Sequence, residues 1–436
     1  MTNEERRDYC LKKNVKRSPL LIALTWDIIF FWTISTLFFT TQKGLTYSQV
    51  ISLDSIVMFL GCVMCVPVNR IFQNMSPINA TRIGLLGYGG YILLVIFGKS
   101  FPVFIAAQFF LAFGYAVMAV KVNSVLTDSL HGLKREKEYE KVYGNGLSIY
   151  YIINFVGSIL ITYVYEWNAY VAAWCTFIVV VLAELYTLLF KDVKKFQQRN
   201  VDLKSDEKLN TTKNKPDGYF KILKSSFFIC LLVFMFLMRG VLSITGSSYK
   251  IYVQQAIDLG AVPIWLFGYL YAGSRLCAAL ASRFQFKFNL KFGVKSIIIL
   301  VVGTLILFVA PALLYLYNST SIISIVVITI LCYMQMCIYV ICRIFVNNYM
   351  QVCIRKKNTE RAYAIRTMVE YLGYAAISAV FAWLLSAFGN NWGITNLVYI
   401  GIFAIPLIVA MIFFLRALCK KYAQKYTIIK DEYTND

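Results

Sequence analysis

Ionisable side chains inside long apolar runs are the first feature of this sequence that could carry chemistry. A charged group in the middle of a bilayer costs roughly 2.5–3.5 kcal/mol on insertion scales, so each one requires a partner or a water-filled cavity. Acids and bases are nearly balanced among these groups, which favours paired charges over one large ion pore. The nine positions are Asp27, Asp54, Lys121, Glu184, Arg239, Arg275, Arg343, Arg366 and Glu370.

Asp27 and Lys121 are predicted to lie at comparable depth in two helices that run in opposite directions. Asp27 is eight residues past the start of its apolar run at Pro19, about 12 Å along a helix, and Lys121 is seven residues before Asp128. A pair between them has two interpretations. Protonation of Asp27 could break it and couple a proton to a conformational change, or it could be a fixed structural salt bridge.

Arg239 is predicted to lie near the middle of the bilayer. It is fourteen residues past Ser225, about 21 Å along a helix. A guanidinium group there can hold a carboxylate or phosphate in a bidentate fork, or it can neutralise an acidic side chain. We favour a role in the substrate site or in gating. Arg343 is expected near the position in the second half that corresponds to Lys121 in the first.

The remaining charges favour structural or gating roles. Arg366 and Glu370 are spaced i, i+4, which places them on one helix face as a structural pair, although Glu370 is also a candidate proton carrier. Glu184 and Arg275 are expected close to the cytoplasmic ends of their helices, at a gate or, for Arg275, extended toward the interface. Asp54 is expected near the outer end of its helix in a structural role.

Aromatic residues are abundant, and most are expected to anchor helices at the membrane interface or to pack between them. Phe30, Tyr150 and Tyr339 are the candidates for a cavity lining, where a ring can stack on a solute or bind a cation. The single histidine leaves a histidine-based metal site or catalytic dyad without a second imidazole. The sequence also has no P-loop, so we expect no ATP, no metal, no cofactor and no enzymatic activity.

The elements that must position these residues are membrane-spanning helices. Hydrophobic residues make up 59% of the chain and charged residues only 15%, against about 25% charged in soluble domains. Apolar runs long enough to cross a bilayer recur along the sequence. We predict an all-α membrane protein with twelve spans, which begin near Pro19, Tyr47, Ala80, Pro102, Tyr139, Trp167, Ser225, Val262, Phe292, Ser321, Glu360 and Trp392.

Residues 191–224 form the one long polar segment in the interior of the sequence, and we interpret them as a cytoplasmic connector. The spans before and after it match in order at nearly constant offsets, which indicates two six-helix bundles, residues 19–190 and 225–418. Residues 1–18 and 419–436 are predicted to be cytoplasmic tails.

The formal charge of +21 could suggest a nucleic-acid partner, but the distribution of the basic residues favours another explanation. Most Lys and Arg residues fall in the tails, the connector and alternate loops, while the other loops contain only Lys43, Lys99 and Lys250. Cytoplasmic loops are enriched in Lys and Arg, so both termini are predicted to face the cytoplasm and no nucleic acid is expected.

Twelve spans in two halves with a basic central segment resemble the major facilitator superfamily. Ser282-Arg283 followed by Phe292-Gly293-Val294-Lys295 is similar to its loop motif, and Val66-Pro67-Val68-Asn69-Arg70 is the matching loop of the first half. Asn69 stands where the family usually has Asp. The resemblance implies that Arg70 and Arg283 belong to the cytoplasmic gate, and that the first, fourth and seventh spans line a central cavity.

Two further comparisons with this superfamily concern coupling. Gly114 matches the glycine pattern of the fourth span, but Phe110 stands where many proton-coupled members have Arg. The fifth span lacks the Gly-Pro kink of many drug–proton antiporters. Two stretches are similar to uncharacterised members from Gram-positive bacteria: TWDIIFFWTISTLFFTTQKGLTYSQ and LTDSLHGLKREKEYEKVYG.

The resemblance implies a monomeric secondary transporter in the cytoplasmic membrane that moves a small organic solute by alternating access. We expect protons as the coupling ion, with Asp27 and Glu370 as titrating candidates, and an amphipathic solute whose anionic group meets Arg239. Export of a small molecule or peptide is slightly favoured over uptake of a nutrient. A lipid flippase and a transporter-like sensor that no longer cycles are alternatives from other classes.

Overall fold

The computed structural model describes residues 3–72, 75–135, 138–191, 226–318, 321–353 and 359–422, and these form helices joined by short turns. The helices of the first half are α1 (Asn3–Thr25), α2 (Phe31–Leu37), the π-helix η1 (Phe38–Gln42), α3 (Tyr47–Ile71), α4 (Pro77–Phe97), α5 (Phe101–Gly132), α6 (Tyr139–Trp167) and α7 (Ala169–Thr187). Those of the second half are α10 (Ser226–Asp258), α11 (Ile264–Phe292), α12 (Lys295–Tyr317), α13 (Ile322–Cys353), α14 (Thr359–Ala387) and α15 (Trp392–Tyr422).

The predicted all-α architecture with twelve spans is confirmed. Eleven helices in the described residues are long and apolar enough to cross a membrane. The remaining span is the first in the chain, and it consists of α1, α2 and η1 in succession. Local signals fix several helix starts: Thr46 and Gln49 form a capping box before α3, and Asn168 accepts hydrogen bonds from two backbone N–H groups of α7.

The first span is broken in the middle, whereas the sequence predicts one continuous helix there. Residues 26–30 are not helical, and Phe30 has φ 74°. The Asp27 carboxylate accepts a hydrogen bond from the backbone N–H of Ile28, a local bond that competes with helical pairing. The Phe30 ring lies against Gly157 of α6, where any side chain would collide with it. Tertiary packing therefore holds Phe30 in a backbone conformation that a non-glycine residue rarely adopts.

The predicted N-terminal tail is helical, because α1 begins at Asn3 and runs through it. Arg7 donates a hydrogen bond to the Gly132 carbonyl, Asn14 bonds to the backbone of Lys191, and Arg17 donates to the Leu189 carbonyl. These hydrogen bonds hold the polar start of α1 against the end of α5 and the segment that follows α7. Residues 192–225, which hold nearly all of the predicted connector, and the tail beyond Tyr422 lie outside the described residues.

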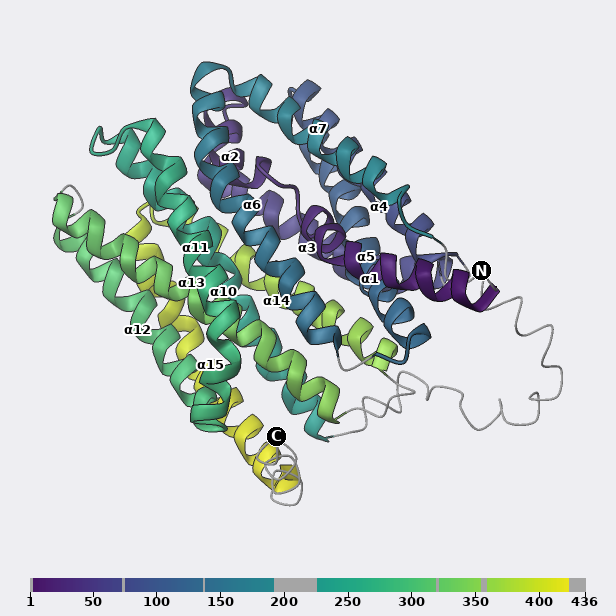
Figure 1. Ribbon diagram of the computed structural model, residues 1–436. Helices are drawn as coiled ribbons and strands as arrows, with labels where there is room; N and C mark the ends of the chain where they lie inside the picture. The colour runs from purple at the N-terminus through teal and green to yellow at the C-terminus, as the bar shows by residue number, and fades with distance from the viewer. Residues whose placement is uncertain are drawn as a thin grey trace.

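The two halves lie side by side, with the purple-to-teal helices on one side and the green and yellow helices on the other (Figure 1). Both ends of the described chain lie at one end of the helices, which we call the terminus side; the opposite end is the distal side (Figure 1). Across the boundary, α3 packs against α14 and α6 packs against α11. These two helix pairs hold the halves together.

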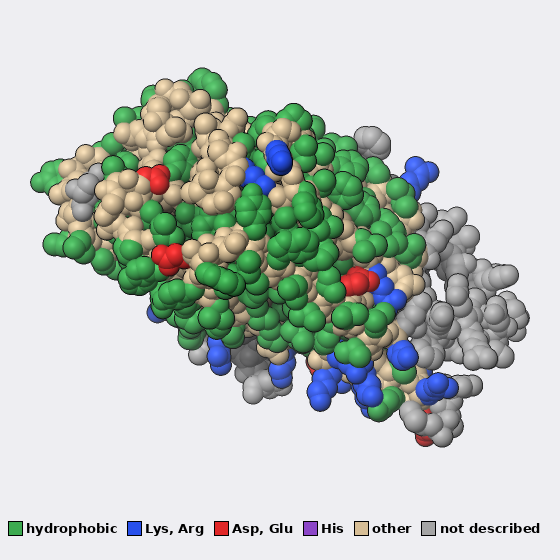
Figure 2. All heavy atoms as spheres, turned by 90° about the horizontal axis from the view of Figure 1, so that it is seen from above, with side chains coloured by type: hydrophobic (Ala, Val, Ile, Leu, Met, Phe, Trp, Pro, Cys, Tyr) green, Lys and Arg blue, Asp and Glu red, His purple; other side chains and the backbone are tan. Residues whose placement is uncertain are grey.

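Hydrophobic side chains cover most of the outer surface. Figure 2 shows one face on which they predominate, with few acidic side chains and with Lys and Arg concentrated toward one edge. Large apolar residues on several helices point outward, among them Leu86, Trp383 and Ile405, which are all more than half exposed. Such a surface is stable in lipid and not in water, so the chain is a multi-pass membrane protein.

Candidate transport cavity

A cavity of about 210 Å³ lies between the two halves. Its walls come from α1, α2, α3, α4, α5 and α6 of the first half and from α10, α11, α13 and α14 of the second. The lining is aromatic and charged, with three guanidinium groups and two carboxylates among its side chains. The charged members are Asp27, Arg239, Arg275, Arg343 and Glu370, and the Trp and Tyr members are Trp26, Trp32, Tyr88, Tyr115, Tyr150, Tyr151, Tyr339, Tyr371 and Tyr374.

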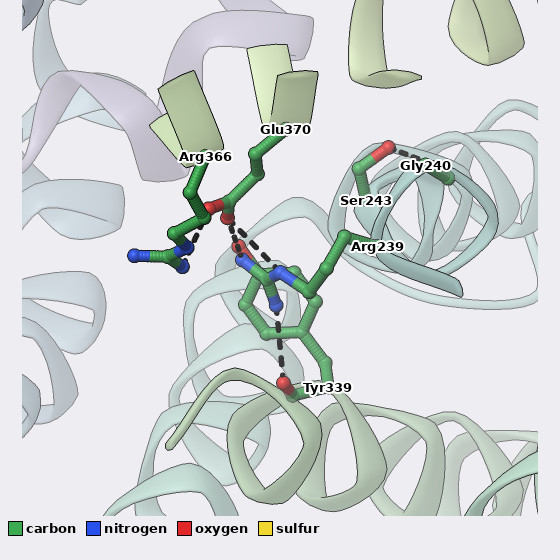
Figure 3. Close-up of polar contacts among 6 residues, drawn as sticks. All are labelled: Arg239, Gly240, Ser243, Tyr339, Arg366 and Glu370. Carbon is green, nitrogen blue, oxygen red and sulfur yellow. Dashed lines mark hydrogen bonds and ion pairs between the residues drawn. The ribbon is translucent and has the colours of Figure 1, made fainter. Parts of the chain in front are cut away.

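Arg239 and Glu370 form an ion pair at the second-half wall (Figure 3). Arg239 Nε and Nη2 donate to Glu370 Oε1 at 3.0 and 2.6 Å, and Nη1 donates to the Tyr339 carbonyl at 3.2 Å. Glu370 Oε2 accepts from Arg366 Nη2 at 2.6 Å, so the pair predicted from the i, i+4 spacing is present. One carboxylate therefore joins two guanidinium groups, and Arg239 already has a carboxylate partner.

Asp27 lies at the break in the first span, where its carboxylate has neutral hydrogen-bond donors. Oδ1 accepts from the Tyr115 hydroxyl at 2.5 Å and from the Ile28 N–H at 2.8 Å. Oδ2 accepts from the Tyr150 hydroxyl at 3.3 Å. The break after α1 and the helices α5 and α6 thus meet at this side chain.

Lys121 does not form the predicted pair with Asp27 in the described part of the structure. It is buried in α5 and makes other interactions, while its neighbours Ala119, Val122 and Asn123 line the cavity. Comparable depth along two helices does not ensure that two side chains face one another. The rotation of α5 decides this, and it turns Tyr115, two turns away, toward Asp27 instead.

Arg275 and Arg343 both line the cavity and, among the described residues, neither has a carboxylate partner. The Arg343 guanidinium lies 4.1 Å from the ring centre of Trp26, across the boundary between the halves. Arg275 lies over the ring of Tyr271 at 4.6 Å and donates to its hydroxyl, while its Nε is buried without a hydrogen-bond partner. The cavity therefore has two guanidinium groups with unused donors.

The prediction for Arg275 is wrong in position. The sequence places it near the cytoplasmic end of its helix, whereas α11 continues seventeen residues further, to Phe292, about 25 Å of additional helix. The apolar span of α11 ends at Gln285, but the helix continues to Phe292, so the end of the helix lies further from Arg275 than the sequence predicts. Arg275 is 7% exposed and belongs to the cavity wall.

Buried polar groups on the distal side of the cavity were not recognised as a set in the sequence. Lys250, expected in an outer loop, is in α10 and 2% exposed. Its Nζ donates to the Trp32 carbonyl at 2.9 Å and to the Ser35 hydroxyl at 3.0 Å, and it lies 4.2 Å from the Trp32 ring centre. Asp54 accepts from the Ser247 hydroxyl at 2.9 Å. Both contacts join the first half to the second.

The other predicted gating residues lie away from the cavity. Glu184 is on α7 in the neighbourhood of Arg82, and one of its carboxylate oxygens is buried without a hydrogen-bond partner. Arg70 and Arg283 are exposed near the terminus-side ends of α3 and α11. Their gating roles stay predictions. On the same surface, Glu138 forms an ion pair with Arg135, which lowers the pKa of its carboxyl group.

Two of the three predicted cavity aromatics line the cavity, Tyr150 and Tyr339. Phe30 does not, because its ring packs on Gly157 inside the first half. Trp26, Tyr115 and Tyr151 line the cavity and were not singled out. Tyr115 lies four residues, about one helical turn, before Ala119 on the same face of α5. This spacing identifies Tyr115 as a lining residue only when another lining residue of α5 is already known.

The family is decided by a comparison with models of protein families. Residues 18–378 match the model described as Major Facilitator Superfamily. The chain belongs to the major facilitator superfamily. It is therefore a secondary transporter of this superfamily, a class of transporters and not of enzymes, and the resemblance drawn from its loop motifs is confirmed.

Two solved structures of a nucleoside transporter, NupG, are similar in fold to this chain. A point mutant of NupG superimposes with a TM-score of 0.71 at 12% sequence identity, over 93% of this chain and 100% of the other. A second NupG structure gives 0.68 at 13% identity, over 93% and 99%. At this identity the likeness concerns the fold alone. A search of curated protein sequences gave no match.

Proposed function

We propose that this transporter moves a small organic solute across the cytoplasmic membrane by alternating access, coupled to protons, with both termini in the cytoplasm and export as the direction. The supporting observation is the position of the cavity. It lies between two halves that are hydrogen-bonded to each other on the distal side, so that rocking one half against the other would change the side from which the cavity is reached.

The distal contacts include several hydrogen bonds between the halves. The Tyr47 hydroxyl donates to Asp258 at 2.5 Å, the Ser48 hydroxyl to the Ala382 carbonyl at 3.0 Å, and Lys250 to Trp32. Further bonds join Ser55 with Ser378, Ser247 with Asp54, and Tyr163 with Tyr269. Lys250 also donates to the Ser35 hydroxyl across the boundary, at 3.0 Å. The cavity extends from Trp32 toward Asn123 near the terminus side, which in this state favours loading from the cytoplasm.

Asp27 is the better of the two carboxylates for carrying a proton. Glu370 is held by two guanidinium groups, and protonating it would leave both of them without their counter-charge in a buried site. Asp27 has hydroxyl and amide donors, so it can take up a proton without breaking an ion pair. It also lies at the break in the first span, where a change of charge acts directly on backbone geometry.

The test is proton movement in proteoliposomes that contain a pH-sensitive dye. Wild type, Asp27→Asn and a surface control, Glu138→Gln, are screened against a mixed panel of metabolites and drugs. Nucleosides are included because of the nucleoside transporter with the same fold. We expect one solute to move protons with wild type and the control. With Asp27→Asn we expect solute counterflow to persist while the pH gradient no longer drives accumulation.

The orientation of the gradient distinguishes export from uptake. Antiport gives proton movement opposite to the solute, and symport gives movement in the same direction, which would replace export by uptake. If no solute of the panel exchanges with wild type or with the Glu138→Gln control, the transport proposal is wrong, and a flippase or a sensor would explain the fold better. If Asp27→Asn still shows gradient-driven accumulation, the coupling role of Asp27 is wrong.

A further inference from the structure

We propose that the substrate is a small aromatic anion, whose acidic group binds Arg275 and Arg343 and whose ring lies among Trp26, Tyr150 and Tyr151. This inference rests on the proposed transport function and names its substrate class. It also moves the anion site away from Arg239, the residue that the sequence favours.

The charges of the cavity wall support an anion. Three guanidinium groups face two carboxylates in the lining. Glu370 and Arg239 neutralise one another, and Glu370 also holds Arg366. Asp27 is opposed by neutral donors from Tyr115 and Tyr150. The lining therefore carries a net positive charge, and in the described residues neither Arg275 nor Arg343 has a carboxylate at ion-pair distance. A guanidinium group matches the planar oxygen pair of a carboxylate or phosphate in a bidentate geometry.

The donors of these two arginines are also available. Arg275 is 7% exposed, yet its Nε has no hydrogen-bond partner, which is costly for a buried charged group. The Arg343 guanidinium lies over the face of the Trp26 ring, and this contact leaves its in-plane N–H groups free. An acidic group placed between them would satisfy donors on both α11 and α13.

Aromatic side chains from the first half oppose these arginines. Trp26 and Tyr150 have ring centres 6.2 Å apart, and those of Tyr150 and Tyr151 are 5.1 Å apart. Tyr151 lies within electrostatic range of Arg239, Arg275 and Arg343, so this ring cluster and the arginines share one region of the cavity. Rings of this kind bind a flat solute by stacking or edge contacts.

The volume sets the size of the solute. A cavity of about 150 Å³ accommodates benzene in a protein core. The present cavity, about 210 Å³, therefore has room for one aromatic ring with a small charged substituent. Because residues from both halves line the site, a solute bound there can bias the equilibrium between their arrangements.

The experiment measures binding to the purified full-length protein by quenching of tryptophan fluorescence, with three probes of matched shape. These are phenylacetate, its neutral amide phenylacetamide, and phenyl phosphate. We expect at least one of the two anions to bind at least about tenfold more tightly than the amide, as the loss of charge-assisted hydrogen bonds implies. The stronger of the two distinguishes a carboxylate substrate from a phosphate ester.

Variants test the two arginines. Arg343→Gln and Arg275→Gln are each expected to weaken anion binding about tenfold or more, while the exposed Arg416→Gln on α15 leaves it unchanged. Arg343→Lys keeps the charge but loses the fork, and should fall in between. A thermal melt of each variant checks that it is folded. Equal binding of amide and anions, or unchanged binding in both Gln variants, overturns the inference.

Transport assays separate this inference from the proposed function. If an anion binds through these arginines but crosses no proteoliposome membrane, the site stands and the transport function fails. If a neutral or cationic solute is transported and neither anion binds, the transport function stands and the anion site is wrong.

Discussion

Arg239 of α10 and Glu370 of α14 form a two-point ion pair, with Arg239 Nε and Nη2 donating to the same carboxylate oxygen at 3.0 and 2.6 Å. The side chains are 4% and 13% exposed, and Arg366 holds the other oxygen. The pair joins two helices of the second half beside the cavity. We therefore expect the pair to contribute to the stability of the protein.

Glu370→Gln is expected to destabilise the protein by about 3–5 kcal/mol, because removing one member of a buried pair leaves the other charge uncompensated. Thermal unfolding in detergent measures the change. The double variant Arg239→Met with Glu370→Leu should recover part of the loss, since apolar groups of similar size need no partner. A single variant as stable as wild type would show that water already compensates these charges.

Tyr115→Phe is expected to lower the rate of proton-driven transport. The Tyr115 hydroxyl donates to Asp27 at 2.5 Å, so its loss removes a group that fixes the position of this carboxylate. Tyr150→Phe removes a longer bond of 3.3 Å and should give a smaller decrease. Initial rates of transport driven by a pH gradient measure both. The reverse order of the two decreases would contradict this assignment of donors.

Lys250→Met is expected to loosen the distal contact between the halves. The Nζ bonds to Trp32 and Ser35 cross the boundary, and a hydrogen bond to a charged group contributes about 1.5–3 kcal/mol. Spin labels at the exposed distal positions Trp167 and Tyr317, with the native cysteines replaced, should show a larger population at long distance.

The matched control for the Lys250 contact is Lys43→Met. The Lys43 Nζ donates to the Ile96 and Gly98 carbonyls, and all three residues belong to the first half. It is therefore expected to leave the distance distribution unchanged. The same shift in both variants would mean that a general loss of stability, and not the contact between the halves, moves the labels.

Gly268→Ala is expected to push α6 and α11 apart on the distal side. An added Cβ would lie 2.5 Å from the Ser158 carbonyl oxygen, so backbone and not only side chain must move. Overpacking of this kind costs about 1–3 kcal/mol. Labels at Trp167 and Trp265 should report a wider distal side, whereas Gly401→Ala, with open space around it, should not. An unchanged distance in Gly268→Ala would show that the interface is not tightly closed.

The sequence by itself determined the membrane class, the twelve spans and the superfamily. Lipid requires apolar runs of fixed length whose backbone groups are all paired within a helix, and this requirement is local, so starts such as Tyr47, Tyr139 and Trp392 were read correctly. The i, i+4 pair of Arg366 and Glu370 was predictable for the same reason, because one turn of helix brings the two side chains together.

Only the tertiary structure decided which charges meet and where the first span breaks. Arg239 and Glu370 are 131 residues apart in the chain, and their contact depends on the packing and rotation of two helices. The same freedom of rotation turned Tyr115 and not Lys121 toward Asp27. The break at Phe30 depends on the space that Gly157 leaves on another helix. Helix formation in lipid follows from composition, whereas the site follows from contacts between distant segments.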